Sequence, residues 1–195
     1  MNKVNVKHYV KQQIHRIENM NADGPRKAEL AKLRNGIGKT PGNMPELWGM
    51  FLKDLPMQEL AQAKEYTPSN EEWAIYTALT LFALHQQGND IKTNCMNSEE
   101  IPLGIAISRL ALPGDDDKED RIRNRFNQMA TSSDLLELSH YLRGIIQLLR
   151  ADNIKLDYGA LAQDLLYYQN PNARDGVRLK WGRDFYRGIS AQKSN

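Results

Sequence analysis

Cysteine is nearly absent from this sequence: Cys95 is the only one among 195 residues. A single thiol excludes an intrachain disulfide framework and any metal site built from several cysteines, and it is typical of proteins in a reducing cytoplasm. Aromatic residues make up 8% of the chain, and no run approaches the roughly 18 apolar residues that a membrane-spanning helix requires. We therefore expect a globular, cytoplasmic protein without a membrane partner.

Strand patterns are missing as well. No run alternates polar and apolar residues over more than a few positions. Apolar residues recur instead with helical spacing, as in the stripe from Val6 to Ile17, which predicts a helix over about 5–19. Ser69 and Glu72 form a capping box ahead of another such stripe. The sequence predicts an all-α, two-lobed helical bundle of about eight or nine helices.

The remaining helices are predicted from the same periodicity, at 25–34, from 45 to near 56, 57–65, 69–88, 102–112, 115–129, 134–149, 157–168 and 174–187. Residues 88–114 form the least regular stretch, and we place a lobe boundary there. The expected lobes are residues 1–90 and 91–195. Trp48 and Trp181 lie on apolar helical stripes, and both are interpreted as core anchors.

Motifs for catalysis and metal binding are lacking. Gly36 to Thr40 resembles the end of a P-loop, but Leu33 stands where that motif requires its first glycine, and a helix precedes it instead of a strand. The run Asp115 to Asp117 fits the preference of a helix start for negative charge. The four histidines match no metal-ligand spacing: His8, His15, His85 and His140. We expect no enzymatic activity, no metal and no cofactor.

Charge is strongly segregated along the chain. Residues 1–40 carry nine Lys/Arg against three Asp/Glu, residues 41–120 carry five against fourteen, and residues 121–195 carry twelve against seven. The local net charges are therefore +6, −9 and +5. The two basic ends are suited to a shared surface for a polyanion, and intramolecular charge complementarity is the alternative. Composition alone does not choose between them.

Five segments together resemble the small subunit of the type I-E CRISPR Cascade surveillance complex, the CasB family. They cover most of the chain: Arg26 to Arg34 running into a Gly/Pro loop and Pro45 to Trp48, Gly104 to Ala111, Arg121 to Met129, Ile154 to Tyr158 followed by Leu161 to Tyr168, and Val177 to Tyr186. None of these segments is a catalytic signature, so the resemblance depends on their order and number.

The resemblance implies a non-enzymatic, two-lobed helical subunit that is present as a pair in a crRNA-guided complex. Its partners would be the other Cascade subunits, a second copy of itself and the target DNA backbone, without sequence preference. Its basic surface would guide the opened DNA strands and stabilise the R-loop. The basic positions that match the family's motifs are Arg34, Lys39, Arg109, Arg123, Arg125, Arg143, Lys180 and Arg183.

Two other functions stay open from the residues. A helical, sequence-specific DNA-binding regulator would need a polar recognition helix that reads base edges, whereas the last predicted helix offers mainly phosphate-type contacts. A protein-only scaffolding module would use the charge segregation for protein partners. Arg109 and Arg183 have a structural alternative too, which is pairing with acidic neighbours such as Asp184.

Overall fold

The computed structural model describes residues 4–51, 67–111 and 114–193. Within these ranges the chain forms helices and no strand, apart from one isolated bridge between Asn97 and Leu156. The helices are α1 (Val6–Glu18), α2 (Asp23–Asn35), α3 (Pro45–Phe51), α4 (Asn70–His85), α5 (Leu103–Ser108), α6 (Asp116–Ala130), α7 (Leu135–Ala151), α8 (Tyr158–Tyr168) and α9 (Pro171–Lys193). The all-α prediction is confirmed, and the helix predicted at 57–65 lies outside the described residues.

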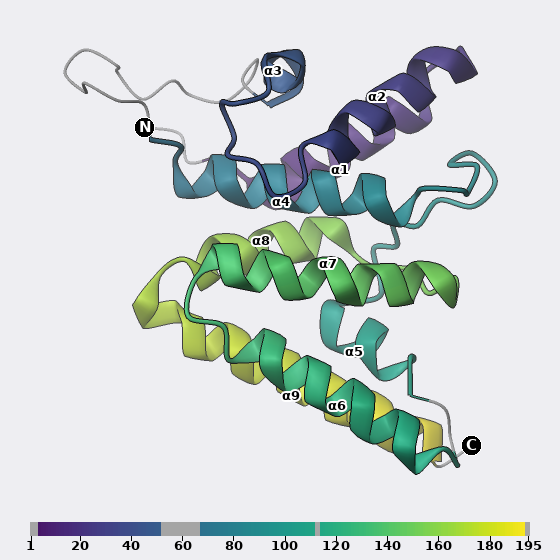
Figure 1. Ribbon diagram of the computed structural model, residues 1–195, viewed down its shortest axis with the longest axis vertical. Helices are drawn as coiled ribbons and strands as arrows, with labels where there is room; N and C mark the ends of the chain where they lie inside the picture. Colours follow the sequence, from purple (N-terminus) through teal and green to yellow (C-terminus); the bar gives the residue numbers. More distant parts are fainter. Residues whose placement is uncertain (1–3, 52–66, 112–113, 194–195) are drawn as a thin grey trace.

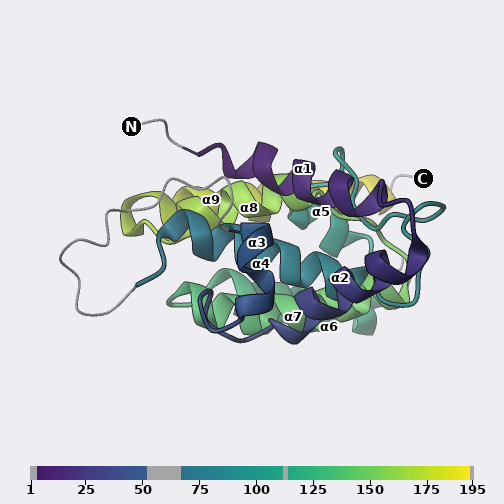
Figure 2. The ribbon, with the colours of Figure 1, turned by 90° about the horizontal axis from the view of Figure 1, so that it is seen from above.

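Helix α4 is the central element, since every residue from Ala74 to His85 is buried. A helix that is apolar around its whole circumference requires neighbours on all sides. Helices α2 and α7 lie on one side of α4, and α1 and α8 lie on the other (Figures 1 and 2). Since α2 and α7 both pack on α4, the surface between them is a place where side chains from distant parts of the sequence meet.

Helices α5, α6 and α9 form the end of the molecule that is farther from α2 and α3 (Figure 1). A Cβ atom at Gly104 of α5 would lie 2.4 Å from the carbonyl oxygen of Trp181, so the close approach of α5 and α9 requires glycine there. Phe126 of α6 and Phe185 of α9 stack with their ring centroids 4.5 Å apart. Trp181 is fully buried, which confirms its interpretation as a core anchor.

The buried apolar residues on both sides of the 88–114 stretch belong to one cluster. Helix α8, which follows this stretch in sequence, packs against both α1 and α4. The proposed lobes therefore share a core, and the boundary between them stays a prediction. None of the described helices is long and apolar enough to cross a membrane.

Several helix starts have the caps that their sequences predict. Ser69 and Glu72 form the complete capping box of α4. Asp115 accepts a hydrogen bond from the backbone amide of Lys118 at 2.8 Å, which stabilises the start of α6. Asp115 is therefore the cap of α6, and Asp116 and Asp117 lie in its first turn, where negative charge is favoured.

Trp48 is not a core anchor, and that expectation was wrong. Its side chain is 46% exposed, and its Nε1 donates a hydrogen bond to the carbonyl oxygen of Gly42 at 3.2 Å. Leu47, its neighbour on α3, fills the core position instead and is 1% exposed. On a short helix with one buried face, adjacent residues cannot both point inward.

His85, at the end of α4, is completely buried and makes a 2.9 Å hydrogen bond through Nδ1 with the Tyr158 hydroxyl. Burial lowers the pKa of His85 from 6.5 to about 4, and the nearby positive charge of Arg150 acts in the same direction. The unfolded chain therefore binds a proton at a higher pH than the folded chain does. The stability contributed by neutral His85 is complete above the unfolded pKa and is lost as the pH falls toward 4.

We expect the free energy of unfolding to fall by about 2 kcal/mol between pH 7 and pH 5 through this histidine alone. Urea unfolding of the wild type and of His85→Gln at both pH values measures the effect. The glutamine variant is expected to lose less stability over this interval. An equal loss in both proteins would show that His85 is not the group responsible.

Candidate nucleic-acid interface

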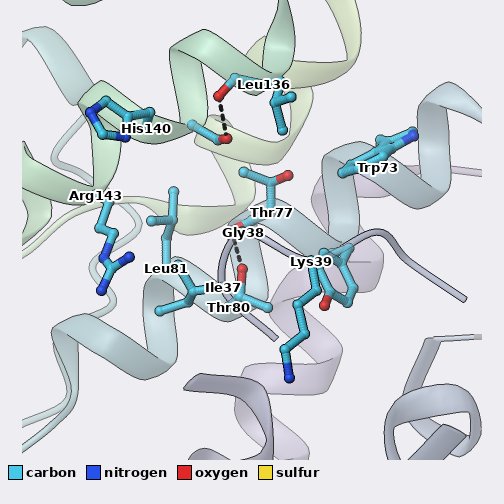
Figure 3. Close-up of a pocket in the computed structure, with 12 residues that line it drawn as sticks. Ile37, Gly38, Lys39, Trp73, Thr77, Thr80, Leu81, Leu136, His140 and Arg143 are labelled. Atoms are coloured by element: carbon cyan, nitrogen blue, oxygen red, sulfur yellow. Dashed lines mark hydrogen bonds between the residues drawn. The ribbon is translucent and has the colours of Figure 1, made fainter. Parts of the chain in front are cut away.

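Lys39 and Arg143 are 104 positions apart in sequence but line the same pocket (Figure 3). The pocket has a volume of about 240 Å³ and lies between the loop after α2, helix α4 and helix α7. The two cations stand on opposite sides of it, with Thr77 and Leu81 of α4 between them. The structure thus brings together two of the basic residues that the sequence singled out.

The loop that carries Lys39 is fixed to α4 by a buried hydrogen bond. The Tyr76 hydroxyl donates to the carbonyl oxygen of Gly36 at 2.7 Å. Burial raises the pKa of Tyr76 to about 12, so the phenol keeps its proton at neutral pH. Gly38 has a φ of 77°, in the left-handed region that glycine adopts without strain, and it turns the chain toward Lys39. The position of the Lys39 backbone is therefore built into the fold.

Two hydroxyl groups of the pocket donate hydrogen bonds to backbone carbonyl oxygens of their own helices. Thr80 donates to the carbonyl oxygen of Thr77 at 3.1 Å, and Ser139 donates to that of Leu136 at 2.8 Å. These hydroxyls therefore have their protons occupied within the protein. Lys39 and Arg143 are the charged side chains that line this pocket, so its charge is positive.

Arg34, at the end of α2, has a second guanidinium nearby. Burial lowers the pKa of Arg34, and the charge of Arg150 on α7 lowers it further. Arg150 itself donates a hydrogen bond to Oε1 of Gln87 at 2.9 Å. Two guanidinium groups close together favour binding of an anion between or beside them.

We refer to Arg34, Lys39, Arg143 and Arg150 as the groove cations. Within the described ranges, no carboxylate lies within 4 Å of any of the four. Arg150 was missed in the sequence, although it follows Arg143 by seven positions and therefore lies near the same face of α7.

Arg123 and Lys180 have a different environment, because each is paired with acidic side chains. Arg123 binds Glu119 and Asp120, one turn earlier on α6, at 2.5 and 2.7 Å. Lys180 binds the buried carboxylate of Asp164 at 2.7 Å. Their role as DNA contacts stays a prediction, and these ion pairs give both residues a structural role as well.

Asp164 is the centre of the second pairing. It accepts hydrogen bonds from Nζ of Lys180 and, at 2.8 Å, from Nε1 of Trp181. Burial nevertheless raises the pKa of Asp164, which outweighs the opposing effect of Lys180. A buried carboxylate is costly without such partners, so Lys180 stabilises the contact between α8 and α9.

The other three predicted positions, Arg109, Arg125 and Arg183, are exposed. Among the described residues no carboxylate lies within 4 Å of them, and the alternative pairing of Arg109 or Arg183 with Asp184 is not observed.

Figure 2 shows α2, α6 and α7 on one side of the molecule and α1, α8 and α9 on the other. The predicted positions therefore do not form one surface, since α9 is on the side away from the groove cations.

A match between the sequence and a family model shows how the chain is related to known proteins. The model described as CRISPR-associated protein Cse2 matches residues 29–186. The chain belongs to the Cse2 family. This confirms the resemblance to the small subunit of type I-E Cascade, and the matched range contains all eight predicted basic positions, from Arg34 to Arg183. None of the curated proteins matches the chain.

Solved structures share the fold. CasB from Thermobifida fusca is 31% identical with a TM-score of 0.75, and the match covers 95% of this chain and 99% of that one. CasB from M. ruber is 22% identical with a TM-score of 0.67, over 95% and 97% of the two chains. A chain of a CRISPR RNA-guided surveillance complex is 19% identical with a TM-score of 0.70, over 95% and 96%. The last two matches show the fold of this Cse2 protein, and the first supports the family as well.

Proposed function

We propose that the chain is a non-catalytic, nucleic-acid-binding subunit of a crRNA-guided CRISPR interference complex, in which it guides DNA strands and stabilises the R-loop. Membership of the Cse2 family supports a place among the other Cascade subunits and the crRNA. Two matched structures are a CRISPR RNA-guided surveillance complex and such a complex in a pre-nicking state. The observation that carries the proposal is that Lys39 and Arg143 line one pocket, with no carboxylate within 4 Å of either among the described residues.

The groove cations are suited to the nucleic-acid backbone. In an RNA-guided complex, base pairing with the guide reads the sequence, and the protein contributes contacts to backbone phosphates. Unpaired Lys and Arg side chains supply such contacts, and binding then weakens steeply with salt. The groove cations come from α2, its following loop and α7, so an opened strand would lie across the surface beside α4.

The remaining basic positions belong to the same proposal. Arg109, Arg125 and Arg183 are exposed and are proposed as further backbone contacts. Arg123 and Lys180 would have to share their charge with Glu119 and Asp164, respectively. We also propose that the subunit acts as a pair with a second copy of itself, in the cytoplasm.

We propose no catalytic role. The aspartate run that comes closest to a metal-binding sequence begins with Asp115, whose carboxylate is engaged by the amide of Lys118. This cap gives Asp115 a structural role at the start of α6. Mg²⁺-dependent cleavage of nucleic acid that is lost in Asp116→Asn would contradict this part of the proposal.

Binding to several unrelated single-stranded and double-stranded DNA sequences tests the function. The purified subunit is expected to bind all sequences of one length with affinities within a few-fold of each other, and weakly. A marked preference for one sequence would indicate a regulator instead. No binding in low salt, together with normal assembly into the complex, would indicate a protein-only scaffold.

A further inference from the structure

A second cavity lies beside α2, between this helix and residues 86–92. It has a volume of about 700 Å³. Among the described residues, four cations and two carboxylates line it, which gives a net charge of +2: Arg26, Lys27, Arg34, Lys92, Asp23 and Asp90. The cavity therefore has the charge required to hold an anion.

Arg26 is the unusual member of this lining because it is only 5% exposed and poorly paired. Asp23 is the one carboxylate within 4 Å of its guanidinium among the described residues, and the distance is 3.8 Å. The other oxygen of Asp23 binds Lys27 at 2.7 Å. The buried Nε of Arg26 has no hydrogen-bond partner in the described part of the chain.

A buried guanidinium with unused N–H donors is expensive unless an acceptor reaches it. Arginine has five such donors in a planar fork. The described part of the chain supplies Arg26 with one distant carboxylate, although most residues that line the cavity are polar or charged. The arrangement therefore fits a ligand that brings its own negative oxygens.

The wall opposite α2 is well ordered by hydrogen bonds around Gln86, which is 1% exposed. Its Nε2 donates to the carbonyl oxygens of Asn89 and Asn94 at 3.1 and 3.0 Å, and its Oε1 accepts from the amide of Met96 at 2.8 Å. Gly88 turns the chain here with a φ of 89°. Because this loop is held from within, the cavity is a fixed feature of the fold.

We propose that this cavity binds one phosphate group of a nucleic-acid backbone, with the Arg26 guanidinium as its anchor. This inference rests on the proposed function. Phosphate is favoured because an arginine fork matches two of its oxygens, and because Arg34 belongs both to this cavity and to the groove cations. Arg26 and Arg34 are separated by about 12 Å along α2, so they contact different phosphates of one strand.

Arg26→Met tests the anchor, since methionine keeps an apolar stem of similar length without the charge. The melting temperature and the affinity for a mixed-sequence single-stranded DNA are measured for the wild type and the variant. We expect an equal or higher melting temperature, because an unpaired buried charge is removed. We expect the affinity to fall about three- to tenfold and the salt dependence to lose about 0.7 from its log–log slope. A lower melting temperature with unchanged affinity would make Arg26 purely structural and overturn the proposal.

Two companion variants keep the outcomes distinct. Lys32→Met removes the same charge from an exposed position of α2 outside the cavity, and it is expected to change the affinity less than about twofold. The double variant Lys39→Gln, Arg143→Gln is measured in parallel. If this double variant loses affinity while Arg26→Met does not, only the phosphate site fails. If neither loses affinity, the proposed function fails too.

The source of the phosphate is tested with inorganic phosphate. Competition of millimolar inorganic phosphate with DNA in the wild type, but not in Arg26→Met, supports a backbone phosphate at this site. Phosphate binding that depends on Arg26 without any effect of Arg26→Met on DNA affinity would indicate a free anion and overturn the proposal. Retained DNA binding with failed assembly of the complex would indicate an acidic protein partner and would overturn it as well.

Discussion

Trp181→Ala is expected to lower the free energy of unfolding by about 3 to 5 kcal/mol, before any nucleic acid is present. Trp181 is fully buried and stacks on Tyr168 with ring centroids 5.6 Å apart. Its Nε1 also donates to Asp164, so truncation creates a cavity and removes one donor from a buried carboxylate. Urea unfolding followed by circular dichroism measures the change.

Trp48→Ala is the matched control, because it removes the same side chain from a position that is 46% exposed. We expect a loss of about 1 kcal/mol or less, consistent with a partly exposed ring and one hydrogen bond to backbone. Similar losses in the two variants would contradict the placement of Trp181 at the centre of the contact between α8 and α9.

Removing three groove cations is expected to weaken target binding by a rebuilt complex by about ten- to 150-fold, if each contact contributes about 0.5 to 1 kcal/mol. The variant carries Arg34→Gln, Lys39→Gln and Arg143→Gln. Its melting temperature is expected to change little, because these side chains lack an acidic partner within the described ranges. A target-binding titration and a melting curve measure the two effects.

A control variant removes the same charge from α1 and α9, on the other side of the molecule (Figure 2). It carries Lys7→Gln, Lys11→Gln and Arg187→Gln. Since Lys11 is paired with Glu99 at 2.9 Å and none of the three is one of the groove cations, target binding is expected to stay within about threefold of wild type. Equal weakening in both variants would show that net charge, and not the position of the groove cations, determines binding.

The helices could be predicted from local patterns because their signals are local. The capping box of Ser69 and Glu72 and the stripe from Val6 to Ile17 each lie within one helix, and the structure confirms both. Trp48 was misplaced because helical spacing alone did not distinguish it from Leu47 as the inward residue of α3. Only the packing of α3 against its neighbours makes that distinction.

The partners and surroundings of the predicted basic residues could be predicted less well from the sequence. The partners of Arg123 precede it by three and four positions, where charged side chains on a helix meet, so this pairing was visible in the sequence. The bond between Lys180 and Asp164 joins two helices and depends on their docking. The placement of Lys39 and Arg143 at one pocket depends on the loop that Tyr76 holds against α4. Neither tertiary arrangement has a local signature.

Arg26 lies in one of the segments that resemble the family, and nothing in the sequence indicates its burial. An arginine in the first turn of a polar helix is ordinarily exposed. Arg26 is nevertheless 5% exposed, and it lines a cavity together with residues 86–92. The sequence therefore located the basic segments, and the fold decides which of their charges line a cavity without a close carboxylate among the described residues.

The salt dependence of binding tests the central claim, that the groove cations neutralise backbone phosphates. The affinity of the subunit for single-stranded DNA is measured over a range of salt concentrations, for the wild type and for the variant lacking Arg34, Lys39 and Arg143. Each lost phosphate contact should reduce the slope of log K against log salt by about 0.7, so the slope should differ by about 2 between the two proteins. Identical slopes would contradict the claim.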